Sequence, residues 1–108
     1  MAKKYKNVLL KISGEILAGD SENIFDHPTS KQIVNDIISV KKSGVNIAVV
    51  IGGGNIIRGI NHRGLALTKT NADHMGMLST IINGIFLKNL LSNNQIKSIV
   101  YSSIAIPG

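Results

Sequence analysis

The 108-residue sequence contains no cysteine, which excludes disulfide bonds, thiolate metal sites and cysteine nucleophiles. It is also poor in aromatic residues, with two Tyr, two Phe and no Trp. A hydrophobic core must therefore come from Ile, Leu and Val, and few rings are left to stack on nucleic-acid bases. The lack of cysteine fits a cytoplasmic protein, since reducing compartments do not favour disulfides.

Long apolar runs are also missing. No stretch approaches the about 20 residues that a membrane-spanning helix requires. The basic start at residues 3–6 is followed by a short apolar run that Lys11 interrupts, so it does not match a secretory signal. The sequence predicts no association with a membrane.

Acidic residues are scarce, with six Asp and Glu against twelve Lys and Arg, for a net charge of +6. Such a balance fits either nucleic acid or small phosphorylated ligands. The lysines are scattered along the chain rather than gathered in one stripe. We therefore expect phosphorylated small molecules. Nucleic acid stays as the alternative and would show as an affinity that falls steeply with salt.

The most informative stretch is a strand followed by glycines. Residues 47–51 form an unbroken apolar run, typical of a strand buried on both faces of a parallel sheet. Three glycines at 52–54 follow, where backbone N–H groups can approach an anion without a Cβ in the way. A helix that opens at Asn55 would point its free N–H groups at the same place, and Arg58 adds a forked donor suited to phosphate. The pattern indicates a phosphate site; a tight turn without a ligand is the alternative.

The first predicted strand, residues 7–12, ends in a similar way. Lys11 lies near its carboxyl end, and Ser13 and Gly14 follow. A lysine buried there would need an anion, because burying an unpaired charge is costly; a lysine that reaches solvent is the alternative. The carboxyl ends of parallel strands meet at one edge of a sheet, so we expect both loops to converge on one crevice.

The first helix is predicted at residues 30–43. Thr29 or Ser30 can cap its start, and Gly44 is placed to end it in the left-handed conformation. The polar segment before it, residues 16–28, is predicted to be a surface loop.

The second helix is predicted at residues 72–91, after a polar segment at 59–71. Gly76 and Gly84 weaken it, and we expect them to allow close packing against another element. Asp73 would lie in its first turn, where a carboxylate complements the helix dipole or accepts hydrogen bonds from sugar hydroxyls.

A third strand is predicted at residues 98–106. The expected architecture is an α/β fold with a parallel sheet in an α-β-α sandwich of three core strands and two main helices. Such a sheet leaves at least one edge and one face without cover. We therefore expect residues 1–108 to be an incomplete domain.

Three motifs occur together in this sequence: Lys11-Ile-Ser-Gly-Glu15, Val50-Ile-Gly-Gly-Gly-Asn-Ile-Ile-Arg-Gly59, and Ala72-Asp-His-Met-Gly-Met-Leu78 with Asn83-Gly84. In this order and spacing they closely resemble the bacterial uridylate (UMP) kinases of the amino-acid kinase superfamily. The two loops are similar to those of the superfamily, and the Asp73-containing motif points to the UMP kinases. The resemblance covers nearly the whole chain. Family members run to roughly twice this length as one domain, a size that single domains can reach.

The resemblance implies the amino-acid kinase fold and transfer of the γ-phosphoryl group of ATP to UMP, giving ADP and UDP in pyrimidine nucleotide biosynthesis. It implies Mg²⁺ with ATP as cofactor and a cytoplasmic homohexamer. Residues 1–108 would be the N-terminal, UMP-side part of the domain, without the ATP-side half, and we expect this chain alone not to turn over. A non-catalytic nucleotide-binding remnant or regulatory module of the same fold is one alternative. A related kinase acting on a carboxylate or carbamate is another.

The family's functional positions fall on residues present in this sequence. Those that the resemblance assigns to ATP are Lys11, Ser13, Gly14, Gly54 and Arg58. Lys11 would meet the phosphoryl group in transfer and Arg58 the phosphate at the junction of the two nucleotides, which makes these two the predicted catalytic residues. Gly53 is assigned to UMP, and Asp73 to its ribose. No residue is assigned to a metal site.

Overall fold

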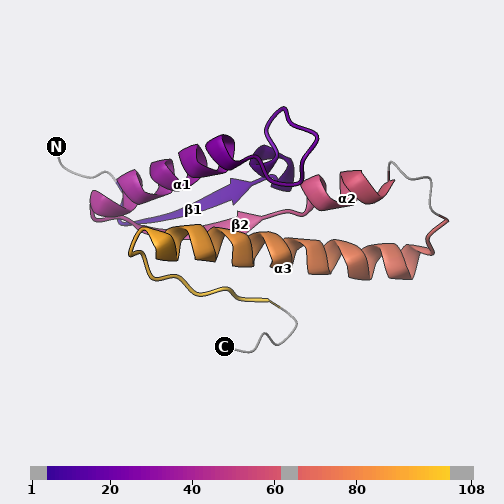
Figure 1. The fold of residues 1–108 in the computed structure, drawn as a ribbon. Helices are drawn as coiled ribbons and strands as arrows, with labels where there is room; N and C mark the ends of the chain where they lie inside the picture. Colours follow the sequence, from indigo (N-terminus) through magenta and orange to yellow (C-terminus); the bar gives the residue numbers. More distant parts are fainter. Residues whose placement is uncertain (1–4, 62–65, 103–108) are drawn as a thin grey trace.

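The computed structural model describes residues 5–61 and 66–102. Its elements in chain order are strand β1 (Asn7–Ile12), the 3-10 helix η1 (Gly14–Leu17), helix α1 (His27–Lys42), strand β2 (Asn46–Ile51), helix α2 (Gly54–Asn61) and helix α3 (Lys69–Asn93). In Figure 1 the two strands are drawn between α1 above and the long α3 below, and both helices contribute to the core on the same face of the sheet. The structure is thus of the predicted mixed α/β class.

The sheet consists of β1 and β2, which pair in parallel from Asn7 opposite Asn46 to Ile12 opposite Ile51. Strand β1 has the predicted bounds, and β2 begins one residue before the predicted run at 47–51. A polar residue follows β1 and a glycine follows β2. One face of the sheet belongs to the hydrophobic core, where Ile12 packs with residues of α1 and α3.

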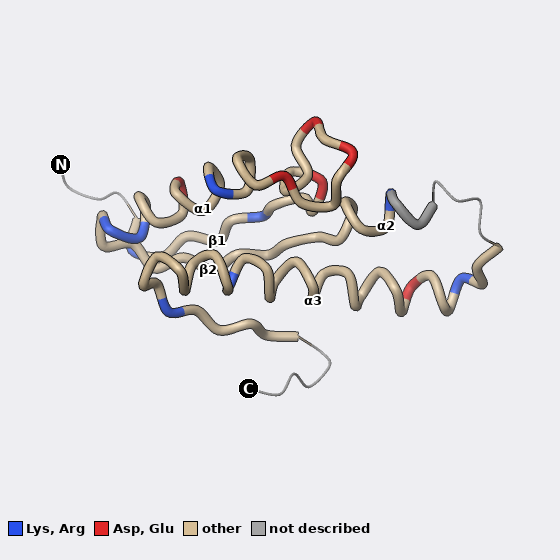
Figure 2. Tube along the Cα trace, in the orientation of Figure 1, with Lys and Arg blue, Asp and Glu red and all other residues tan. Residues whose placement is uncertain are grey.

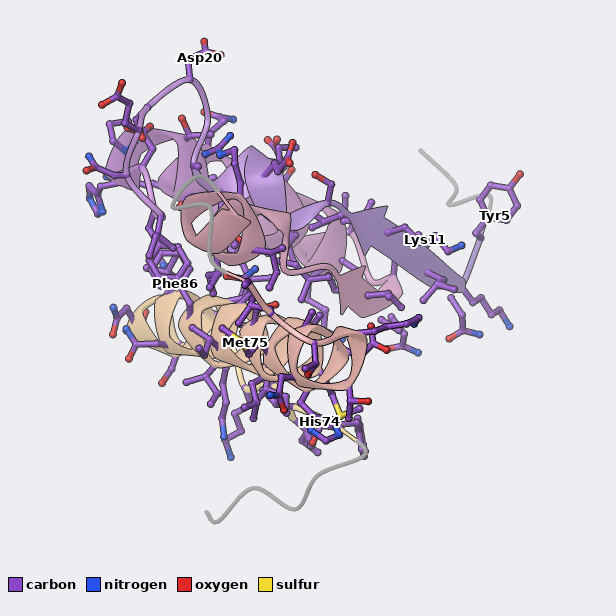
Figure 3. The ribbon with its side chains drawn as sticks, turned by 90° about the vertical axis from the view of Figure 1, so that its right-hand side faces the viewer. Tyr5, Lys11, Asp20, His74, Met75 and Phe86 are labelled. Carbon is purple, nitrogen blue, oxygen red and sulfur yellow. The ribbon has the colours of Figure 1, made fainter. Side chains whose placement is uncertain are left out.

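The other face of the sheet is open. Successive side chains of a strand point to opposite faces, and Leu9 and Val50 on the open face are 61% and 52% exposed. Lys11 projects from β1 on this side, away from α3 (Figure 3). The prediction that β2 is buried on both faces is wrong for the described residues, because helices cover only one face.

Helix α1 begins earlier than predicted. Its cap is Asp26 rather than Thr29 or Ser30, and its carboxylate accepts a hydrogen bond from the backbone N–H of Thr29 at 3.1 Å. The Thr29 hydroxyl and then this N–H lower the pKa of the Asp26 carboxyl below its ordinary value. Pro28 is tolerated, because the first helical turn needs no backbone donor there. At the other end Gly44 has a φ of 91°, so the predicted left-handed stop is confirmed.

The segment predicted as a surface loop at 16–28 is partly wrong. It contains part of η1, and Leu17 and Ala18 are fully buried. The Ser30 hydroxyl donates to the Leu17 carbonyl at 3.1 Å, and the Phe25 ring stacks on Phe86 of α3 with 3.9 Å between centroids. The loop is therefore anchored to α1 and α3 at points that its polar composition does not reveal.

Helix α3 also begins earlier than predicted, since Thr68 caps it by accepting a hydrogen bond from the backbone N–H of Asn71 at 3.2 Å. Asp73 consequently lies in the second turn rather than the first. Close packing at Gly84 is confirmed, because a Cβ there would lie 3.3 Å from Val100. At Gly76 the same prediction is wrong within the described residues, where a Cβ would meet nothing within 4 Å.

The segment predicted as a polar loop at 59–71 overlaps both neighbouring helices. Its first residues end α2, and its last residues begin α3. His62, Arg63 and Gly64 lie outside the described residues.

The predicted third strand is not formed in its described part. Residues 98–102 make no sheet pairing, and 103–106 lie outside the described residues. This segment runs along α3 (Figure 1), and Val100 contacts Gly84. Together with β2 and α3 it lines an apolar groove of about 720 Å³. The segment therefore packs on the helix and leaves one edge of β2 unpaired within the part of the chain that the structure describes.

In the two described stretches, no helix combines the length and the apolar character needed to cross a bilayer.

Candidate functional site

The two loops that follow β1 and β2 lie against each other. The backbone N–H of Gly52 donates to the carbonyl of Ile12 at 3.1 Å, so the sheet pairing continues into the loops. A Cβ on Gly14 would lie 2.6 Å from the Gly52 carbonyl oxygen and 2.7 Å from the Gly54 nitrogen. The predicted convergence of both loops at one edge of the sheet is confirmed.

The glycines at 52–54 are not equivalent. A Cβ on Gly53 would overlap the Ser79 hydroxyl and lie 2.8 Å from the Ser79 Cβ. A Cβ on Gly52 would meet only the Gly14 nitrogen, at an ordinary 3.5 Å. At Gly54 the nearest atoms belong to the flexible side chain of Glu15. Of the three glycines, Gly53 is therefore the one that a larger residue cannot replace without displacing the buried Ser79.

Gly54 is also the first residue of α2. The Gly53 carbonyl accepts hydrogen bonds from the N–H groups of Ile56 and Ile57 at 3.1 Å, which starts the helix. The first N–H groups of a helix have no intrahelical acceptor, and together with the helix dipole they favour an anion. The loop and the start of α2 can thus present backbone donors to a phosphate group.

Three polar residues are buried behind the glycines, and the sequence analysis did not predict that they contribute to the site. Ser79 and Asn83 of α3 are one turn apart and almost fully buried, as is Asn55 at the start of α2. Asn83 donates to the Gly52 carbonyl at 2.7 Å. The sequence did contain a signal for them, namely amide and hydroxyl side chains within the apolar face of a helix. Buried polar groups require hydrogen-bond partners, so such residues indicate a polar contact with another element.

Lys11 and Ser13 are both exposed. Lys11 is opposite Val50 on the open face of the sheet. The hypothesis of a buried lysine that needs an anion is therefore wrong within the described residues. The structure contains the alternative, a strand-end lysine that reaches solvent. Ser13 precedes η1 in an extended conformation and makes no side-chain capping hydrogen bond. Both residues lie at the loop end of β1.

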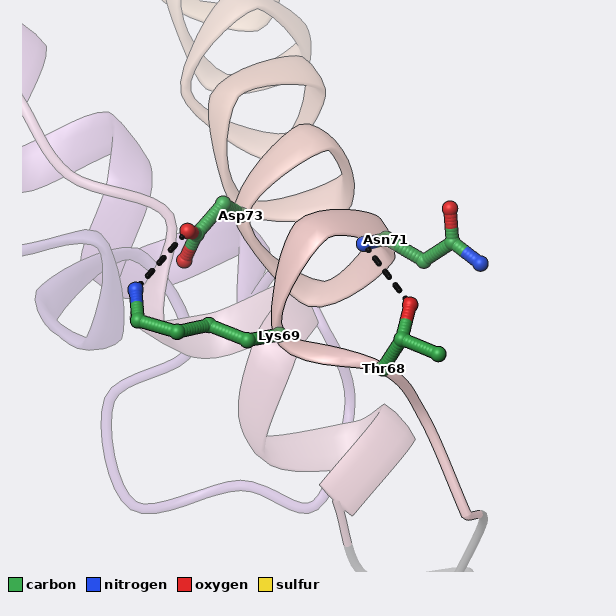
Figure 4. A network of polar contacts seen from close by, with 4 residues as sticks. All are labelled: Thr68, Lys69, Asn71 and Asp73. Carbon is green, nitrogen blue, oxygen red and sulfur yellow. Dashed lines mark hydrogen bonds and ion pairs between the residues drawn. The ribbon is translucent and has the colours of Figure 1, made fainter.

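Arg58 and Asp73 extend the site away from the glycines. Arg58 is half-buried in the last turn of α2. Asp73 forms an exposed ion pair with Lys69, 3.0 Å between Nζ and Oδ2 (Figure 4). Since Ser79 contacts Gly53, Asp73 lies about 9 Å farther along the helix, at 1.5 Å per residue. A ligand that reaches both Gly53 and Asp73 would have to extend along α3.

Charges are unevenly distributed around this edge of the sheet. Four of the six acidic residues fall within segment 15–26, which includes the loop that projects above the loop end of β1 (Figure 2). The basic residues lie on separate elements, and within residues 5–61 and 66–102 they do not form one stripe. This distribution does not match the continuous basic surface typical of nucleic-acid binding.

The family model and the similar proteins agree on one family. Residues 6–108 match the model of the amino acid kinase family. The uridylate kinase of Rickettsia bellii is 46% identical over 101 residues, which cover 94% of this chain and 42% of that protein. The uridylate kinase of Bartonella bacilliformis is 42% identical over 107 residues, which cover 99% of this chain and 45% of that protein.

Solved structures give the same result for the fold. The crystal structure of UMP kinase from Ureaplasma parvum matches with a TM-score of 0.82 and 34% identity, over 95% of this chain and 43% of that one. UMP kinase from Bacillus anthracis matches with a TM-score of 0.75 and 38% identity, over 84% of this chain and 37% of that one. The chain spans less than half the length of each of these relatives.

Proposed function

The chain belongs to the amino acid kinase family, and from this premise we propose that it supplies the nucleotide phosphate loops of a uridylate kinase. The observation that carries the proposal is the contact between Gly14 and the glycines at 52–54, which brings two backbone-lined loops to one place. The similarity to proteins named uridylate kinase supports UMP as the acceptor. The reaction proposed is ATP + UMP to ADP + UDP.

In this reaction an oxygen of the UMP phosphate attacks the γ-phosphorus of ATP. The new P–O bond forms as the bond from the γ-phosphorus to the β,γ-bridging oxygen breaks, and ADP leaves with that oxygen. The attacking oxygen is already anionic, so no base has to remove a proton. Catalysis then consists of holding the two phosphates in line and balancing their charge, for which backbone N–H groups, one lysine and one arginine are suited.

The proposed roles divide between the two loops. On the ATP side, Ser13, Gly14 and Gly54 hold phosphate oxygens, and Lys11 meets the phosphoryl group in transfer. The exposure of Lys11 leaves its ammonium group accessible to a ligand at the loop end of β1. On the other side, Gly53 faces UMP.

Arg58 and Asp73 complete the proposed assignment. Arg58, one turn into α2, contributes a forked donor where the two phosphates meet. Asp73 accepts hydrogen bonds from the UMP ribose, and its position along α3 suits a ligand that runs from Gly53 along that helix. Lys69 would then compete with the ribose for the carboxylate, because it already forms an ion pair there.

Magnesium is proposed to enter with ATP. Within the described stretches no group of three or more His, Asp or Glu residues could hold a metal ion, so these residues do not by themselves fit a resident metal site. Mg²⁺ commonly takes one or two carboxylates plus substrate phosphates. Its contribution would be to neutralise charge on the ATP phosphates, and none of the residue roles above depends on it.

A homo-oligomer, a hexamer by the family resemblance, and a cytoplasmic location are also part of the proposal. In support of assembly, Leu78, Ile82 and Ile85 form an exposed apolar stripe along α3, each between 46% and 48% exposed. Helices that are apolar on several faces are usually covered. The absence of cysteine fits the cytoplasm.

The test of the proposed function is UMP binding by calorimetry, with the Asp73→Asn variant. We expect wild-type protein to bind UMP and Asp73→Asn to bind it about tenfold more weakly, since a charge-assisted hydrogen bond contributes about 1.5–3 kcal/mol. Lys69→Ala is the matched control: it breaks the same ion pair but keeps the carboxylate, and exposed pairs contribute little.

The outcomes separate the alternatives. Equal loss of affinity in both variants would mean that the ion pair, not the ribose, explains Asp73. Absence of UMP binding by the wild-type protein would contradict the proposed function. We expect no UDP formation from ATP, UMP and Mg²⁺ in the same samples, because the chain spans less than half of its relatives; robust turnover would contradict the expectation that this chain alone is inactive.

A further inference from the structure

Asn55 and Asn83 form a buried amide pair behind the glycine loop. Asn55 is 2% exposed and Asn83 is completely buried. Asn83 Nδ2 donates to Asn55 Oδ1 at 2.7 Å, and Asn55 Nδ2 donates back to Asn83 Oδ1 at 3.2 Å. The two side chains come from α2 and α3, so the pair ties these helices together.

The remaining donors of both amides hold backbone carbonyls. Asn83 Nδ2 donates to the Gly52 carbonyl at 2.7 Å, and Asn55 Nδ2 donates to the Ile24 carbonyl at 2.9 Å. Each NH₂ group therefore uses both of its N–H donors, and each Oδ1 accepts one bond. Because a backbone carbonyl can only accept, the orientation of both amides is fixed.

This arrangement determines the direction of a peptide unit in the loop. The carbonyl of Gly52 and the N–H of Gly53 belong to one planar trans peptide and point in opposite directions. When Asn83 holds the carbonyl toward α3, the Gly53 N–H must point the other way. The side chain of Asn83 thus sets the direction of a backbone donor that it does not touch.

The pair also touches the first loop. A Cβ on Gly14 would lie 2.7 Å from Asn55 Oδ1, so the loop after β1 rests directly on the Asn55 amide. Through Ile24 the same amide holds the segment between η1 and α1. One buried pair therefore fixes three segments relative to each other.

We propose that Asn55 and Asn83 are positioning residues for phosphate binding, which orient the backbone donors of the two loops without contacting the ligand. The inference rests on the proposed function, because it states how the same site is kept in order. An amide is required at both positions. An aspartate would lose two donors and bury a negative charge facing a carbonyl oxygen, where an uncompensated charge is strongly unfavourable.

The test compares Asn83→Asp with Asn89→Asp, which makes the same chemical change at an exposed position of the same helix. The first measurement is hydrogen exchange, by NMR, of the Ile56 and Ile57 backbone amides, which both donate to the Gly53 carbonyl. We expect Asn83→Asp to increase their exchange rates at least about tenfold, as expected when a buried polar group loses its partner. Asn89→Asp should leave both rates unchanged.

The second measurement is the UMP dissociation constant at a temperature where every variant is folded. We expect Asn83→Asp to weaken binding about tenfold. Ile37→Ala, a core change in α1 that lowers overall stability, should leave the affinity within about twofold. If Asn83→Asp does not fold, Asn55→Ala replaces it, since that variant keeps the bond from Asn83 to the Gly52 carbonyl and should have a smaller effect of the same kind.

Each result decides the inference. Unchanged exchange at Ile56 and Ile57 in the folded Asn83 or Asn55 variant would overturn it. Faster exchange with UMP affinity no lower than that of Ile37→Ala would also overturn it, because the pair would then be structural only. If the wild-type protein binds no UMP, the proposed function fails, and the positioning role for phosphate fails with it. The exchange measurement then shows separately whether the amide pair orders the loop.

Discussion

Replacing Gly53 with alanine is expected to destabilise the protein by about 3 kcal/mol, at the upper end of the usual cost of overpacking. The new methyl group would overlap the Ser79 hydroxyl and lie 2.8 Å from the Ser79 Cβ. Ser79 is nearly fully buried, and its hydroxyl donates to the Gly76 carbonyl at 2.6 Å, so it cannot move aside freely. Chemical denaturation followed by circular dichroism measures the change.

Two variants serve as controls for this prediction. Gly76→Ala places a methyl group where nothing lies within 4 Å, so it should stabilise α3 by up to about 1 kcal/mol through helix propensity. Ser79→Gly removes the side-chain atoms that the methyl group added at position 53 would meet, so Gly53→Ala should cost less in that background. An equal cost of Gly53→Ala with and without Ser79 would show that the contact with α3 is not the reason for glycine.

Replacing Gly14 with alanine is expected to push the two loops apart. Its methyl group would meet the Gly52 carbonyl oxygen, the Asn55 side-chain oxygen and the Gly54 nitrogen, all between 2.6 and 2.7 Å. These atoms belong to the backbone or to the buried amide pair, so relief requires movement of the loop itself. We expect a loss of about 2–3 kcal/mol in stability and a marked loss of ATP affinity, measured by denaturation and calorimetry.

Gly52→Ala is the control for the Gly14 prediction. It adds the same methyl group to the facing loop, where the nearest atom is the Gly14 nitrogen at 3.5 Å. This is an ordinary contact distance, so both stability and ATP affinity should remain close to those of the wild-type protein. If Gly52→Ala were as harmful as Gly14→Ala, the loops would not be arranged as described.

The local signals in the sequence were sufficient for the two paired strands and for the convergence of the loops. The strand predicted at 7–12 has these bounds, and the apolar run at 47–51 lies within β2, which begins one residue earlier. Parallel pairing then required their carboxyl ends to meet. Gly44 ended α1 as predicted, because a left-handed φ is a property of the single residue.

The helix starts were predicted less well, because several residues could act as caps. With Asp26 and Thr68 as caps, each helix begins three residues before the predicted start. The Asp-His-Pro sequence was assigned to the surface loop at 16–28, although proline is favourable in the first turn of a helix. Which residue caps a helix depends on the local backbone geometry. Several neighbouring Ser, Thr and Asp residues have a suitable side chain, so the sequence alone does not identify the cap.

Features that depend on distant contacts could not be predicted. Ser79 and Asn83 contribute to the site only because α3 packs against the glycine loop; polar residues on the apolar face indicate burial, but no local pattern shows which loop they meet. The exposure of Lys11 follows from the open face of the sheet, whereas an unbroken apolar run such as 47–51 predicts a strand covered on both faces. Residues 98–102 have the composition of a strand but pack on α3 instead.

The central claim is that both loops form one phosphate site, and NMR titration with ATP tests it most directly. The predicted result is that the backbone amide signals of Gly14 and Gly54 shift together and follow one dissociation constant, while that of Gly19, in the loop after η1, stays in place. Shifts in only one loop, or two different dissociation constants, would contradict the claim.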